Sequence, residues 1–402
     1  MEKKEKIFNK NYILLMIVNT LLFISFNMIN PVLPEHITSL GMSVTLAGVI
    51  SGCFSITALI FRPISGIAAD RMNPKWMYAV AGVGITAACV LYMFCSGFAT
   101  FLVARVLHGI FFAVDTTVAL TLVTHFIPVG RMGEGIGLFG IGPIIAISFA
   151  PGIGLKTSHI YGAECCFIIA AVMSFLATIC IVLISYKKEP AADKVQISDD
   201  SNISETKQNK FSIKSFIAVE VIIFALLSGL FSFSNSIEYS FISLYSQSKG
   251  IEDISLYFTV SAAFILLSRL FAGKIYDKKG LSVILYPAFA AVAAGMFIIG
   301  SAKCVGFFFI AAALKALGQG AGQPSLQSQC MVSVEKERMG IASSTYYLGP
   351  DIMQGIGPVV GGIVIDYAGY EAAYYLCGVL MVLGMIIYMV FKKNFSIGKA
   401  NT

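Results

Sequence analysis

Charged side chains recur at helical spacing inside apolar stretches of this sequence, where a charge is costly and usually has a function. The stretch 100–126 carries Arg105, His108 and Asp115, and the stretch 304–328 carries Lys315, Gln319 and Gln323. Residues three, four or seven apart share one face of a helix. A guanidinium, an ammonium or a carboxylate on such a face can bind an organic ion or exchange a proton, so we interpret these residues as candidates for substrate binding or proton coupling.

Two further stripes of polar residues have the same spacing. One, in 11–34, comprises Asn19, Phe23, Asn27 and Asn30; the other, in 214–241, comprises Ser228, Ser232, Asn235 and Tyr239, with Glu220 and Glu238 at its margin. Four polar stripes on four apolar helices need a polar surface to face, and a central water-filled cavity provides one. Asp351, in the stretch LGPDIMQG, is a further candidate for substrate binding or coupling.

Each of these residues also has a structural explanation, which the sequence leaves open. Arg105 could bind backbone carbonyls between helices, and Asp115 could be its partner through His108. Lys315 either pairs with an acid across the cavity or meets an anionic substrate. The Asn side chains of 11–34 are equally suited to hydrogen bonds between helices.

The composition places these stripes in a membrane. Of the 402 residues, 57% are hydrophobic and 12% are charged, whereas about 25% of the residues of a soluble protein are charged. A helix of about 20 apolar residues crosses a bilayer and satisfies its own backbone hydrogen bonds there. Twelve segments qualify: 11–34, 45–69, 76–97, 100–126, 135–156, 164–186, 214–241, 254–276, 281–302, 304–328, 340–365 and 371–391. We therefore expect an all-α integral membrane protein with twelve transmembrane helices in a lipid bilayer.

The distribution of Lys and Arg predicts the orientation. With a cytoplasmic N-terminus, twenty of the 28 Lys and Arg residues fall in cytoplasmic segments, three in outer loops and five within the helices. The positive-inside rule then predicts a multi-pass protein of the cell membrane with both termini in the cytoplasm. The net charge of +6 reflects this bias, and we expect no nucleic-acid partner.

The chain contains an internal repeat with an offset of 207 residues. The stretch RPISGIAADRMNPK begins at Arg62, and its Arg, Gly and Asp return in RLFAGKIYDKKG, which begins at Arg269. The same offset relates Gly142, Pro143, Pro151 and Gly154 to Gly349, Pro350, Pro358 and Gly361. This register predicts two pseudo-symmetric six-helix bundles in one monomeric chain, an N-terminal half 1–186 and a C-terminal half 214–402. The polar segment 187–213 between them is predicted to be a flexible cytoplasmic linker.

Motifs of several other functional classes are missing or lack their context. The nine cysteines lie in or beside apolar segments without CxxC spacing, which is typical of small buried hydrophobic residues. The stretch GIGLFG matches GxGxxG, but no predicted strand precedes it, so it indicates close helix packing. No GxxxxGK[ST] or HExxH stretch occurs. We expect no metal, no cofactor and no enzymatic activity.

The repeated stretch resembles the loop signature of the major facilitator superfamily, Gly-x-x-x-Asp-Arg-x-Gly-x-Lys/Arg, which follows the second helix. GIAADRMNPK matches it with Asn73 in place of the second Gly, and GKIYDKKG echoes it after the eighth helix. RVLHG, from Arg105, is similar to the family motif Arg-x-x-Gln-Gly. GIGPIIAISFAPGIG resembles the Gly-Pro motif of the exporters, with Ala146 and Ala150 where the family prefers Gly.

This resemblance implies the major facilitator fold, with alternating access to one central site. It assigns a gating role to the repeated loops, in which the Asp faces a helix of the other half and the loop latches the two halves on the inner side. The matching residues are Gly66, Asp70, Arg71, Lys75, Gly273, Asp277 and Lys278. It also implies that Arg105 takes part in proton coupling.

We therefore expect a secondary active transporter, most simply a proton-coupled antiporter that exports a small organic molecule or drug. Proton-coupled uptake of a small anionic or zwitterionic solute is the alternative, because Arg105 and Lys315 could hold an anion. A non-transporting membrane receptor is the alternative from another class, although the sequence shows no separate ligand-binding domain. Asp115 and Glu238 are the first candidates for the proton-carrying carboxylates.

Overall fold

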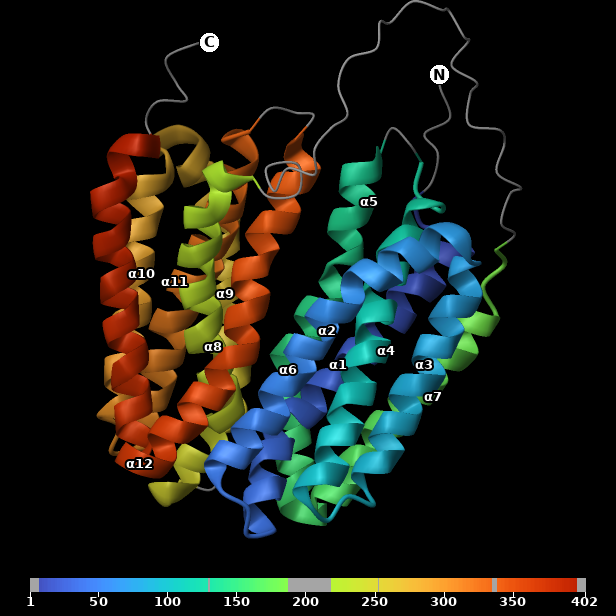
Figure 1. Cartoon of the computed structure of the whole chain (residues 1–402), viewed down its shortest axis with the longest axis horizontal. Helices are drawn as coiled ribbons and strands as arrows, with labels where there is room; N and C mark the ends of the chain where they lie inside the picture. Colours follow the sequence, from blue (N-terminus) through green and yellow to red (C-terminus); the bar gives the residue numbers. More distant parts are fainter. Residues whose placement is uncertain (1–6, 129–130, 187–217, 252, 335–337, 396–402) are drawn as a thin grey trace, which may run out of the picture.

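The chain folds into a bundle of long helices arranged in two groups, which separate toward one end (Figure 1). The computed structural model describes residues 7–128, 131–186, 218–251, 253–334 and 338–395. These residues form helices joined by short turns, and no strand occurs among them. The expected all-α fold is confirmed.

Each group corresponds to one half of the repeat. The N-terminal half contains α1 (Lys10–Ser39), α2 (Val44–Arg71), α3 (Pro74–Tyr92), α4 (Phe98–Thr124), α5 (Met132–Phe139), α6 (Ile141–Tyr161) and α7 (Ala163–Val182). The C-terminal half contains η3 (Val219–Val221), α8 (Ile222–Ser248), α9 (Ser255–Lys279), α10 (Leu281–Gly300), α11 (Val305–Val332) and α12 (Met339–Phe395). The predicted linker 187–213 lies outside the described residues, so the boundaries of the halves remain predictions.

The described residues provide twelve membrane crossings in eleven long apolar helices, because α12 is two helices in sequence. Its apolar part, Ile341–Lys392, has 52 residues, which is about 80 Å of helix and far more than one bilayer crossing needs. The helix breaks at Gly369, where φ is 84° and ψ is 170°. A side chain is rarely tolerated at such a positive φ, so Gly369 lets the chain turn back into the membrane.

Side-chain caps explain several helix starts. Asn9 Oδ1 accepts a hydrogen bond from the backbone N–H of Tyr12 at the start of α1. Asn73 caps α3 by accepting from the N–H of Lys75, and Pro74 occupies the first helical position. Asn73 is the residue that departs from the loop signature, so its cap gives the departure a local structural reason.

The two ends of the bundle differ in how closely the halves approach. We name the end where α1 begins and α12 ends the terminal face, and the other end the opposite face. Near the opposite face, a Cβ on Gly48 or Gly52 of α2 would lie 2.1 Å from a carbonyl oxygen of α12. Near the terminal face, a Cβ on Gly66 or Gly273 would have nothing within 4 Å. The halves are therefore closed at the opposite face and apart at the terminal face, as Figure 1 shows.

Segment 135–156 was predicted as one helix, but the structure divides it. A short α5 ends at Phe139, and α6 begins at Ile141, with Gly140 at the junction. Gly lowers the stability of a helix interior, which favours an interruption here. The predicted segment 214–241 instead extends to Ser248 as α8.

Candidate substrate and coupling site

A cavity of about 520 Å³ lies between the two halves. Its N-terminal wall carries the rings of Phe23, Phe26, Phe54 and Phe112 beside polar side chains. Its C-terminal wall, from α8, α9, α11 and α12, is rich in amide and hydroxyl groups. Five of the ten residues predicted for substrate binding or coupling line it: Asn27, Asn235, Gln319, Gln323 and Asp351. A cavity that combines aromatic rings with hydrogen-bonding groups suits a small amphipathic molecule.

The other five predicted residues are buried behind the cavity walls. They are Arg105, His108, Asp115, Glu238 and Lys315. In the N-terminal half, phenyl rings from neighbouring helices cover the polar stripe of α4. The ring of Phe54 lines the cavity, and its centroid lies 5.1 Å from the guanidinium carbon of Arg105. Helical spacing identified the inward face of α4 but not the rings that cover it.

Arg105 is fully buried and is held by neutral partners. Its Nη2 donates to Asn30 Oδ1 at 2.8 Å, and its guanidinium lies over the ring of Tyr92. Asn30 lines the cavity, so Arg105 is connected to the cavity through its hydrogen bond to Asn30. His108 Nδ1 lies 3.2 Å from the Tyr92 hydroxyl. Among the described contacts, no hydrogen bond joins Arg105 or His108 to Asp115.

Asp115 is a buried acid of the N-terminal half without a hydrogen-bond partner among the described residues. Its side chain is completely buried, and neither carboxylate oxygen has a hydrogen-bond partner in the described part of the chain. An ionised carboxylate without a donor or cation is costly in such surroundings. Asp115 is therefore a group whose charge state is sensitive to any motion that brings a donor or cation nearby.

Lys315 has partners in its own half. Its Nζ lies 2.9 Å from Glu238 Oε2 and 2.6 Å from Asn235 Oδ1, joining α11 to α8. The Lys315 and Glu238 side chains are 4% and 2% exposed, so the pair is shielded from the cavity. Of the two options for Lys315, the structure shows pairing with an acid, and that acid lies beside it instead of across the cavity.

Hydrogen bonds between side chains of the cavity wall connect the two halves. Arg62 Nη1 donates to Asp351 Oδ2 at 2.5 Å and connects α2 to α12. The Tyr239 hydroxyl donates to Asn27 Oδ1 at 2.8 Å and connects α8 to α1. The sequence indicated Asn27, Tyr239 and Asp351 separately, but only the fold shows that they meet partners from the other half.

The gating-loop residues lie at the terminal face. Gly66 and Gly273 border open space, and Asp277 and Lys278 are exposed at the end of α9. Lys75 Nζ donates to the Val182 carbonyl of its own half at 2.9 Å, and Arg71 is exposed. The side chain of Asp70 lies outside the described part of the structure. The latch therefore remains a prediction about a state in which this face is closed.

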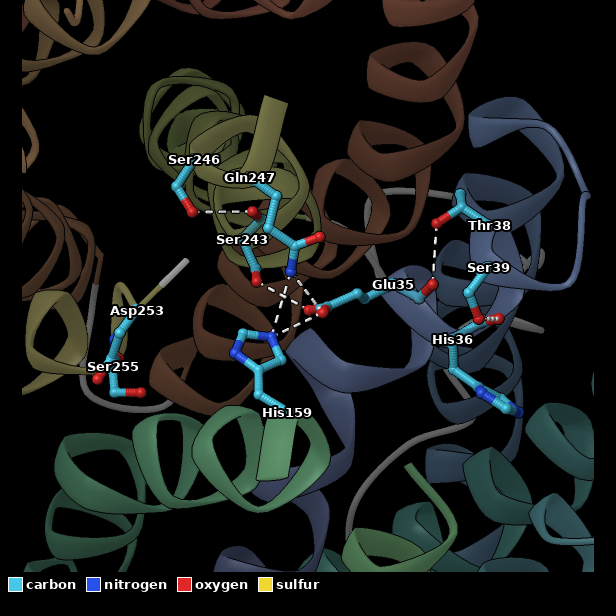
Figure 2. Close-up of polar contacts among 10 residues, drawn as sticks. All are labelled: Glu35, His36, Thr38, Ser39, His159, Ser243, Ser246, Gln247, Asp253 and Ser255. Carbon is cyan, nitrogen blue, oxygen red and sulfur yellow. Dashed lines mark hydrogen bonds and ion pairs between the residues drawn. The ribbon is translucent and has the colours of Figure 1, made fainter. Parts of the chain in front are cut away.

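Sequence reasoning missed a cluster that joins the halves at the opposite face. We define the Glu35 cluster as Glu35 of α1, His159 of α6, and Ser243 and Gln247 of α8 (Figure 2). The Glu35 carboxylate accepts from Gln247 Nε2 at 2.5 Å and from Ser243 Oγ at 2.8 Å. Its Oε1 also lies 2.7 Å from His159 Nε2, a contact that is an ion pair when the imidazole is protonated. An acid at the end of one predicted segment and a His at the end of another were the only sequence signals.

Asp366 of α12 makes a second junction at the opposite face. Its carboxylate accepts from the backbone N–H of Val44 at 3.2 Å and of Thr45 at 2.8 Å. These N–H groups are in the first turn of α2 and have no acceptor within that helix. A negative charge is favoured there by the helix dipole. The C-terminal half thus caps a helix of the N-terminal half.

The sequence of this chain is similar to one family model and to several curated proteins. A sequence model described as the Major Facilitator Superfamily matches residues 15–357 and 305–399. The staphylopine export protein of Staphylococcus aureus is 23% identical over 390 residues, covering 92% of this chain and 93% of the relative. The quinolone resistance protein NorA of Staphylococcus aureus is 21% identical over 396 residues, covering 96% and 97%.

Solved structures share the fold at lower identity. A mutant of the nucleoside transporter NupG has a TM-score of 0.78 at 14% identity and covers 95% of this chain and 99% of its own. A bacterial homologue of the human lysosomal transporter Spinster, in an inward-facing and occupied conformation, has a TM-score of 0.78 at 15% identity, covering 96% and 97%. These similarities support the arrangement of the helices.

Proposed function

Because this chain belongs to the major facilitator superfamily, and is therefore a membrane transporter and not an enzyme, we propose that it exports a small organic molecule from the cytoplasm in exchange for protons. The terminal face is the cytoplasmic one in this proposal, and the protein is a monomer in the cell membrane. The structure is then the state in which substrate enters the cavity from the cytoplasm.

The direction of transport is supported by two observations. The relatives named above include an export protein and a quinolone resistance protein, and both align over more than nine tenths of this chain. The stretch GIGPIIAISFAPGIG, which forms most of α6, resembles the motif of the exporters. The cavity walls combine aromatic rings with amides, as an amphipathic cargo needs.

Proton coupling is carried by one observation, the buried and unpartnered carboxylate of Asp115. In this state a charge on Asp115 is costly, because no donor or cation of the described residues contacts its carboxylate. A rearrangement of α4 that brought Arg105 or water to Asp115 would remove that cost, since an opposite charge favours the ionised form. Alternation between the two states would then bind a proton on one side and release it on the other.

Glu238 is the second coupling candidate, and unlike Asp115 it has a cationic partner. Its carboxylate is already paired with Lys315, so its charge is stabilised in this state. A change in the distance between α8 and α11 would alter that pairing. Two buried acids, one ion-paired and one without a partner among the described residues, with one in each half, fit a mechanism in which the halves move relative to each other.

The test is transport of a quinolone and of ethidium by the purified protein in liposomes under an imposed pH gradient. A pH-sensitive dye would record proton movement. Asp115→Asn and Glu238→Gln should abolish accumulation driven by the gradient but keep exchange at equal pH. The control is Asp253→Asn at the opposite face, where a hydrogen bond from the backbone N–H of Ser255 lowers the pKa of the carboxyl, so no coupling role is expected. A wild-type protein that ignores the pH gradient would contradict the proposal.

A further inference from the structure

The internal repeat places two equivalent arginines in the cavity, one from each half. Arg62 of α2 and Arg269 of α9 are related by the offset of 207 residues, and both line the cavity. Arg62 forms an ion pair with Asp351 of the other half. If the halves were fully symmetric, Arg269 would meet an acid at the position equivalent to Asp351.

That position does not hold an acid. Subtracting 207 from 351 gives 144, and residue 144 is Ile, which also lines the cavity. Arg269 accordingly has no hydrogen bond or ion pair with any residue that the structure describes, and its side chain is exposed to the cavity. Among the described residues, the guanidinium of Arg62 is therefore neutralised by an acid and that of Arg269 is not.

A second unsatisfied group belongs to Gln319, a residue that lines the same cavity. The Oε1 atom of Gln319 is buried and accepts no hydrogen bond in the described structure, whereas its Nε2 donates to Gln323 Oε1 at 3.3 Å. Gln319 is on α11, and α11 packs against α9 close to Arg269, since a Cβ on Gly320 would lie 3.1 Å from the Cα of Ile265. A free acceptor thus lies on the helix beside the free cation.

We propose that Arg269 binds a carboxylate of the transported molecule and that Gln319 accepts a hydrogen bond from its N–H group. The ligand class is a small aromatic acid with an N–H donor, whose ring packs on the phenyl groups of the N-terminal half. The planar fork of a guanidinium matches a carboxylate with two parallel hydrogen bonds. This inference rests on the proposed function only in taking the cavity as the substrate site.

The probes are indole-3-acetate and its neutral amide, indole-3-acetamide, which differ in the carboxylate alone. Binding to the purified protein at equal pH is measured by calorimetry. The wild type should bind the acid at least about tenfold more tightly than the amide, as expected for a charged hydrogen-bonded pair. Arg269→Gln should reduce this preference to less than about twofold, and Arg269→Lys should keep part of it.

Ile144→Asp provides an independent test from the other half, because it places the missing acid opposite Arg269. It should remove the preference for indole-3-acetate, while the matched variant Ile144→Asn should keep it. The inference is overturned if the wild type shows no preference for the acid, including no binding of either probe, or if the preference survives in Arg269→Gln. A preference for the acid without transport driven by a pH gradient would reject the export proposal and retain the carboxylate site.

Discussion

Replacing Glu35 by Gln should shift the protein toward a state that is open at the opposite face. The Glu35 carboxylate accepts hydrogen bonds from Gln247 and Ser243 of the other half and pairs with His159 of its own half. The two contacts with α8 exist only while the opposite face is closed. Glutamine keeps the size of the side chain and one acceptor oxygen but removes the charge.

The expected shift is about 2 kcal/mol. A hydrogen bond to a charged group contributes about 1.5–3 kcal/mol, and an exposed ion pair contributes about 0–1 kcal/mol. The Glu35 side chain is only 15% exposed, so we take a value in the lower part of the range for hydrogen bonds to a charged group. Because 1.4 kcal/mol corresponds to a factor of ten, the ratio of open to closed molecules at this face should rise about 30-fold.

The measurement is the distance between spin labels on Cys304 and on an introduced Ala99→Cys, with the other eight cysteines replaced. Both positions are exposed at the opposite face, one in each half. Thr38→Val is the control, because the Thr38 hydroxyl donates to the Glu35 backbone carbonyl within α1 and does not join the halves. An unchanged distance distribution in Glu35→Gln, or an equal change in Thr38→Val, would refute the reasoning.

Three further predictions concern other contacts. Asp366→Asn should weaken the cap on α2 by about 1 kcal/mol and raise the open fraction at the opposite face about fivefold in the same distance measurement. Gly52→Ala should prevent closure of this face, because its Cβ would lie 2.1 Å from the Gly355 carbonyl oxygen, whereas Gly66→Ala should leave the distances of this state unchanged. Lys315→Gln should lower the free energy of unfolding by about 3–5 kcal/mol, since it leaves Glu238 buried and unpaired; the double variant with Glu238→Gln should recover part of the thermal stability, and additive losses would contradict the pairing.

The elements of the fold could be predicted from the sequence because their signals are local. Twelve apolar segments, a helical stripe through Asn27 and a repeat offset at Arg62 and Arg269 need only spacing and composition. What a polar side chain touches is not local. Arg105 has the same helical face as predicted, yet the ring of Phe54 from another helix separates it from the cavity.

The Glu35 cluster also could not be predicted, because it depends on contacts between residues that are far apart in the sequence. Glu35 and His159 lie at the ends of helices that are 124 residues apart in the chain, where a charge is ordinary and carries little signal. Their significance comes from the meeting of α1, α6 and α8 at one point. The internal repeat did not indicate this cluster either, because the two halves approach each other closely only at the opposite face in this structure.

The close approach of α2 and α12 has a kinetic consequence. Gly48 and Gly52 bring the backbone of α2 against the backbone of α12, so at these two points α2 has no side chain between the helices. At these two points no side chain of α2 has to change its rotamer when the helices separate. We expect the barrier to interconversion, and with it the turnover rate, to depend mainly on the Glu35 cluster and Asp366 at the rim. Residues that never contact the cargo would then set how fast it crosses.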